Sequence, residues 1–122
     1  MKNKTRFLFL FIATTFLLLK YLSFDYCEYN IIKNFPSPDG KWVVTVFSID
    51  CGATVPFNTQ VNISPMYSAF LPERYPAFLV LDGFHDLDIV WISLSMVELT
   101  FPEQAKIIRK EDRRDGVAIL YK

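Results

Sequence analysis

The stretch "SPDGKWVVTVFSIDCGATVPFNTQVNI" (residues 37–63) decides the fold, because it places a turn, a strand, a corner and a second strand in succession. In its first five residues, Pro38 presets φ for a tight turn and Gly40 accepts a positive φ without steric cost. In residues 42–49, apolar side chains occur at even-numbered and at odd-numbered positions, which point to opposite faces of a strand. This pattern predicts a central strand that is covered on both faces.

Residues 57–64 predict a strand of a different kind, with one apolar face and one polar face. The polar face carries three amide side chains, Asn58, Gln60 and Asn62. We expect this face to point to solvent. It is a candidate binding face for a polar partner such as a glycan, and the alternative is a row of simply solvated strand residues.

Short apolar runs separated by Pro, Gly, Asp and Asn continue to the end of the chain and predict a mainly β domain. We expect a small antiparallel meander or sandwich of about six or seven strands, preceded by one N-terminal hydrophobic helix. The β domain is assigned to residues 37–122 and a linker to residues 25–36. Further strands are expected at residues 77–81, 88–92, 97–101, 106–110 and 117–121.

Residues 1–24 combine a basic start with an uncharged run at residues 7–19. The run has the length of a signal-peptide hydrophobic region. If Lys20 extends its ammonium group to the interface, residues 7–24 form a transmembrane anchor about 27 Å long. Both interpretations, a cleaved signal and an uncleaved membrane anchor, place the β domain outside the cytoplasm.

The formal net charge of zero hides an asymmetry along the chain. The first 20 residues contain four of the 13 basic residues and no acidic one, so 13 − 4 = 9 basic residues remain against 13 acidic residues, a net of −4. A mildly acidic domain repels phosphate backbones, and we therefore expect no nucleic-acid partner.

The two cysteines, Cys27 and Cys51, allow one intramolecular pairing. Outside the cytoplasm such a pair favours a disulfide, which would be worth about 3 kcal/mol in the chain-entropy model. The alternative is a thiol–imidazole pair between Cys51 and His85, the only histidine, which would need a free thiol.

The segment "DGFHDLD" (residues 82–88) contains the residue types of a metal site. Asp82, His85, Asp86 and Asp88 are weak candidates for ligands of calcium, zinc or manganese. The alternative is a hydrated turn in which the histidine is held by a hydrogen bond. We expect no metal or other cofactor.

The motifs "SPDGK", "DCGAT", "FNTQV", "DGFH" and "GVAILY" occur in this order along the chain. Together they resemble an uncharacterised family of small bacterial exported proteins, and the resemblance covers residues 27–121. It implies an exported β domain and brings no reaction, ligand or partner with it.

We therefore expect a membrane-anchored or secreted extracytoplasmic protein. On this view it is a binding or structural component of the bacterial envelope, with an envelope protein or glycan as its partner, and it is not an enzyme. The alternative is a thiol- or metal-dependent enzyme or binder that uses Cys51, His85 and the nearby aspartates.

Overall fold

The computed structural model describes residues 2–22, 27–52 and 57–122. Over these three ranges the chain forms one helix and nine strands. Their bounds are α1 Lys2–Leu22, β1 Glu28–Pro36, β2 Trp42–Asp50, β3 Asn58–Pro65, β4 Leu79–Asp82, β5 Asp88–Ser93, β6 Met96–Thr100, β7 Ile107–Lys110, β8 Arg113–Arg114 and β9 Val117–Tyr121. The mainly β fold with an N-terminal helix is confirmed, with more strands than the expected six or seven.

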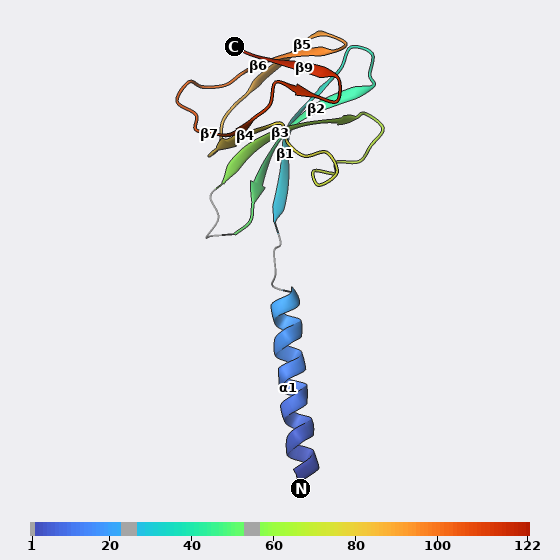
Figure 1. Ribbon diagram of the computed structural model, residues 1–122, viewed down its shortest axis with the longest axis vertical. Coiled ribbons are helices and arrows are strands. Elements are labelled where there is room, and N and C mark those ends of the chain that lie inside the picture. Colours follow the sequence, from blue (N-terminus) through green and yellow to red (C-terminus); the bar gives the residue numbers. More distant parts are fainter. Residues whose placement is uncertain (1, 23–26, 53–56) are drawn as a thin grey trace.

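The strands form two sheets, which are stacked as layers (Figure 1). The five-stranded sheet has the order β1-β2-β3-β4-β7, and its first four strands form an antiparallel meander. The four-stranded sheet has the order β5-β6-β9-β8. Its pairing of β6 with β9 is parallel, so the domain is not wholly antiparallel as expected.

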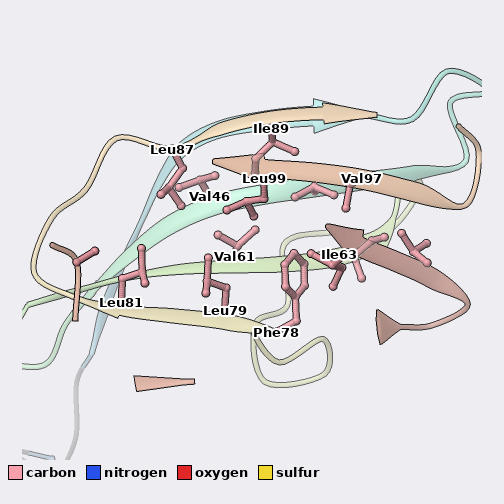
Figure 2. Packing of buried hydrophobic residues seen from close by; sticks show 14 residues of the cluster. Val46, Val61, Ile63, Phe78, Leu79, Leu81, Leu87, Ile89, Val97 and Leu99 are labelled. Atoms are coloured by element: carbon pink, nitrogen blue, oxygen red, sulfur yellow. The ribbon is translucent and has the colours of Figure 1, made fainter. Parts of the chain in front are cut away.

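One hydrophobic core fills the space between the two sheets (Figure 2). Alternate residues of β2, β3 and β4 point into it from the five-stranded sheet, and alternate residues of β5, β6 and β9 point into it from the other sheet. Its residues include Val46, Val61, Phe78, Leu99 and Ile119, all of them at most 4% exposed. The fold is therefore a sandwich built on a meander.

β2 lies between β1 and β3, as expected for a strand that is apolar on both faces. The turn that leads into it has the predicted geometry. Gly40 has φ = +70° and its N–H donates to the carbonyl of Ser37 at 3.0 Å. The Ser37 hydroxyl donates to the Asp39 carboxylate at 2.6 Å, and the Trp42 N–H donates to that hydroxyl at 3.0 Å. This chain of bonds sets the start of β2.

The linker prediction for residues 25–36 is wrong over Glu28–Pro36, because this segment is β1. β1 pairs with β2 and is the edge strand of the five-stranded sheet. A bulge between Ile31 and Lys33 breaks the alternation of β1. This interruption removes the period-2 signal by which a strand is recognised in sequence.

The N-terminal helix α1 is confirmed, and Figure 1 shows it as a rod outside the two layers of strands. Its large apolar side chains between residues 7 and 19 are 58–78% exposed. Within the described residues, no helix is long and apolar enough to cross a membrane. The transmembrane interpretation is therefore not supported. The uncharged run of α1 spans only about 20 Å, against a hydrocarbon core of about 30 Å.

Candidate functional site

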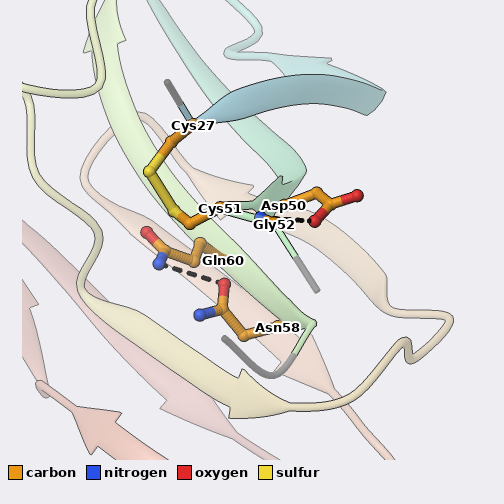
Figure 3. The surroundings of a disulfide bond; sticks show 6 residues. All are labelled: Cys27, Asp50, Cys51, Gly52, Asn58 and Gln60. Atoms are coloured by element: carbon orange, nitrogen blue, oxygen red, sulfur yellow. Dashed lines mark hydrogen bonds between the residues drawn. A yellow bond between two sulfur atoms is a disulfide. The ribbon is translucent and has the colours of Figure 1, made fainter. Parts of the chain in front are cut away.

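The corner after β2 contains the predicted disulfide (Figure 3). Cys27 precedes β1 and Cys51 follows β2, and the neighbouring residues Glu28 and Asp50 face each other in the ladder. The two cysteines are therefore brought together by the strand pairing, and they are bonded to each other. Because the Cys51 sulfur is bonded to Cys27, it is not a thiolate nucleophile in this state. The thiol–imidazole pair, which was the alternative to the predicted disulfide, does not form.

Gly52 supplies the bend in this corner, with φ = +106°. Its N–H donates to the Asp50 carboxylate at 3.1 Å, which is an Asx-type turn. Asp50 and Gly52 thus have structural roles in this corner, with Asp50 as the acceptor and Gly52 as the donor.

His85 is held by hydrogen bonds in the loop between β4 and β5. Its Nε2 donates to the carbonyl of Asp82 at 2.7 Å, and its backbone N–H donates to the Thr59 hydroxyl at 3.0 Å. That hydroxyl is fully buried and donates in turn to the carbonyl of Gly83 at 2.7 Å. These bonds pin the loop to β3, which agrees with the hydrogen-bonded histidine weighed as the alternative to a metal ligand.

The four weak metal candidates are not gathered at one point. Asp86 and Asp88 line a polar hollow of about 400 Å³ together with Lys33, whereas Asp82 and His85 do not line it. Within residues 2–22, 27–52 and 57–122, no three His, Cys, Asp or Glu side chains are grouped so as to hold a metal ion. The geometry gives no support to the metal alternative.

The amide face is only partly as predicted. Asn58, Gln60 and Asn62 do lie on the face of β3 that points away from the core, since Val61 and Ile63 point into it. Asn58 and Gln60 are half-buried, and Gln60 Nε2 donates to Asn58 Oδ1 at 3.1 Å (Figure 3). Asn62, however, is fully buried, so the expectation that it faces solvent is wrong.

Residues 66–77, called the cover segment below, account for this burial. The Asn62 amide donates to the carbonyl of Tyr75 at 2.8 Å. The ring of Phe70 packs edge-on against Phe47 with a centroid distance of 5.0 Å, and it also contacts Tyr29. Part of the cover segment thus forms a second apolar layer on the outer face of the five-stranded sheet.

Arg114 fixes the end of the cover segment. Its guanidinium donates to the carbonyls of Pro76 at 2.5 Å and Ala77 at 3.4 Å and pairs with Glu111. The Tyr121 hydroxyl donates to the carbonyl of Glu111 at 2.5 Å, and burial raises the pKa of this tyrosine. The cover segment is thus tied to β8 and β9, a connection that no local pattern in the sequence encodes.

An apolar groove of about 510 Å³ lies beside the first turn and was not predicted. Its lining includes Trp42, Met66 and Tyr67, and Tyr67 is 90% exposed. The only sequence signal for it is the combination of a turn-flanking tryptophan with an aromatic residue in a proline-containing loop.

A scan of the chain against models of protein families finds no match, and neither curated proteins nor solved structures match it. The resemblance to small bacterial exported proteins therefore stays a prediction.

Proposed function

We propose that this chain is an exported, disulfide-stabilised β domain that acts by binding a polar ligand of the bacterial envelope, with a glycan as the ligand class. The observation that carries the proposal is the bond between Cys27 and Cys51, which uses both cysteines of the chain at one corner of the sandwich. Disulfides persist in oxidising compartments and are rare in the cytosol. The bond therefore supports export.

The features of α1 agree with a targeting role. The helix begins with basic residues, and its uncharged run has the length typical of the hydrophobic region of a secretion signal. Its large apolar side chains are exposed rather than packed into the core of the domain. Because α1 does not pack into the core of the domain, its apolar side chains are accessible to the export machinery.

The binding surface proposed here is the part of the amide face that remains accessible. Asn58 lies directly opposite Asp82 in the pairing of β3 with β4, so their side chains are neighbours on the outer face. The hydrogen bond from Gln60 to Asn58 orients both amides. Amides and carboxylates arranged side by side offer donors and acceptors to neighbouring hydroxyl groups, which is the chemistry of a sugar.

The groups that an enzyme would need have other partners. The Cys51 sulfur is bonded to Cys27, and the His85 ring donates to a backbone carbonyl. This supports a binding role over the thiol- or metal-dependent alternative.

Co-sedimentation with purified insoluble cell-wall glycan tests the proposal. The wild-type protein is expected to pellet with the glycan, and the double variant Asn58→Ala/Gln60→Ala is expected to stay in the supernatant. Gln104→Ala is the matched control, because Gln104 is an exposed amide in a turn outside the amide face. Equal pelleting of all three proteins would contradict the proposed site, and no pelleting of the wild type would contradict the ligand class.

A further inference from the structure

β1 is a nine-residue edge strand whose only partner strand within the described residues is β2. Every residue of β1 except Phe35 is exposed, including the apolar side chains of Tyr29, Ile31 and Ile32. A long edge with exposed apolar side chains is a template for pairing with another strand. Such an edge requires either protection or a partner.

Only the first part of this edge is open. The indole N–H of Trp91, in β5, donates to the carbonyl of Phe35 at 2.9 Å, so this backbone acceptor in the second half of β1 already has a partner. The open part is residues 28–33. It ends at the bulge between Ile31 and Lys33, and a bulge with a lysine limits how far a new strand can extend along an edge.

The register with β2 assigns each side chain of the open edge to a face. Tyr29 and Ile31 face Ile49 and Phe47 and lie on the outer side of the sheet. Glu28 and Lys33 face Asp50 and Val46 and lie on the inner side, because the bulge at Ile32 shifts the alternation by one position. The open edge therefore has the apolar Tyr29 and Ile31 on its outer side and Glu28, Asn30 and Lys33 on its inner side, and the ladder with β2 skips Ile32.

We propose that this edge pairs with the same edge of a second copy of the chain, antiparallel and about a twofold axis at Asn30. In this register Tyr29 lies opposite Ile31 of the second copy on the outer side. If the new ladder skips Ile32 as the ladder with β2 does, Glu28 lies opposite Lys33 of the second copy on the inner side, and symmetry makes each pair twice. Apolar and opposite-charge pairs across antiparallel strands are both stabilising.

Neighbouring registers lack this complementarity. A shift of one residue places outer side chains opposite inner ones, which breaks the two-sided pattern. The opposite edge of the same sheet, β7, carries the adjacent cations Arg109 and Lys110 and has no acid within the strand. Two β7 edges brought together would therefore place cations opposite each other with no acidic residue of the strand to pair with them. Once two β1 edges are paired, neither is available to a third copy, so the assembly closes as a dimer instead of growing.

Cysteine cross-linking in the full chain tests the pairing directly. The exposed residue Asn30 lies on the axis, so Asn30→Cys is expected to give a covalent dimer on mild oxidation, with a peptide joining position 30 to position 30 in mass spectrometry. Ile108→Cys is the matched control, because Ile108 is 58% exposed on the opposite edge strand. A dimer formed equally by both variants would reflect association elsewhere, such as through α1, and would overturn the proposal.

Charge reversal tests the register. In the Asn30→Cys background, Glu28→Lys and Lys33→Glu are each expected to lower the dimer yield several-fold, because each places like charges opposite each other. The combination of both reversals restores opposite charges and is expected to restore the yield. Absence of the position-30 dimer, or no recovery in the combined variant, would contradict this pairing.

Discussion

Two asparagines of one strand show how a residue's environment decides its energetic role. Asn58 and Asn62 lie on the same side of β3, but Asn58 is half-buried and Asn62 is fully buried beneath the cover segment. The Asn62 amide donates to the Tyr75 carbonyl, while its Oδ1 has no hydrogen-bond partner among the described residues. The residue therefore secures the cover segment at the cost of one unsatisfied buried acceptor.

Asn62→Ala removes the donor to the Tyr75 carbonyl and opens a small cavity. We expect a loss of about 1–3 kcal/mol in the free energy of unfolding, measured by urea denaturation. Asn58→Ala is the matched control on the same face, with an expected change within about 0.5 kcal/mol. Equal losses for both variants would contradict the role given to the cover segment.

Asp39 provides a test by pH. The Ser37 hydroxyl and the Lys41 N–H, which both donate to its carboxylate, lower the pKa of Asp39 in the folded state. A lowered pKa means that the ionised carboxylate stabilises the fold above the unfolded value of about 3.9, and that this contribution disappears as pH falls through the folded value.

Asp39→Asn removes the ionisation and is expected to remove this part of the acid sensitivity. The difference in unfolding free energy between wild type and variant should be constant at neutral pH and shrink as the pH falls below about 4. Urea denaturation across this pH range measures it. A difference that stays constant down to the acid end would show that the carboxylate is not held as described.

At the scale of elements, the strands with clean periodicity could be predicted from the sequence, whereas the edge strands β1 and β8 could not. β2, β3 and β9 have unbroken patterns, because regular alternation or a continuous apolar run survives in the residues themselves. β1 has a bulge at Ile32 and was expected to be a linker. β8 has two residues and lies within a charged turn, so it leaves no periodic signal.

In the candidate site, too, some features could be predicted from the sequence and others could not. The disulfide and the orientation of the amide face follow from local pattern and cysteine count. The burial of Asn62 depends on residues 66–77, and their position depends on Arg114, 37 and 38 residues beyond the carbonyls that it binds. Such contacts arise only when the chain has folded.

Trp91→Phe tests the link between the two sheets. The indole N–H of Trp91 is the donor to the Phe35 carbonyl, and phenylalanine keeps most of the apolar packing without that donor. We expect a loss of about 1 kcal/mol in the free energy of unfolding and faster amide hydrogen exchange in β1. Unchanged exchange in β1 would show that the hydrogen bond does not hold this edge.

For the whole molecule, the disulfide joins the ends of β1 and β2 that are most distant from their connecting turn. The two cysteines are separated by 24 positions, so the bond is worth about 3 kcal/mol in the chain-entropy model. Cys27→Ser/Cys51→Ser is expected to lower the free energy of unfolding by about this amount, measured by urea denaturation. The wild type treated with a reductant is the matched control and should lose a similar amount.

The proposed function depends on a domain that leaves the cytoplasm and is oxidised outside it. Counting the free thiols of the exported protein in denaturant, without reductant, tests this most directly. No free thiol is expected after export, and peptide mapping is expected to show Cys27 linked to Cys51 within one chain. Two free thiols in the exported protein would contradict the stabilising role of the disulfide and the proposed function that depends on it.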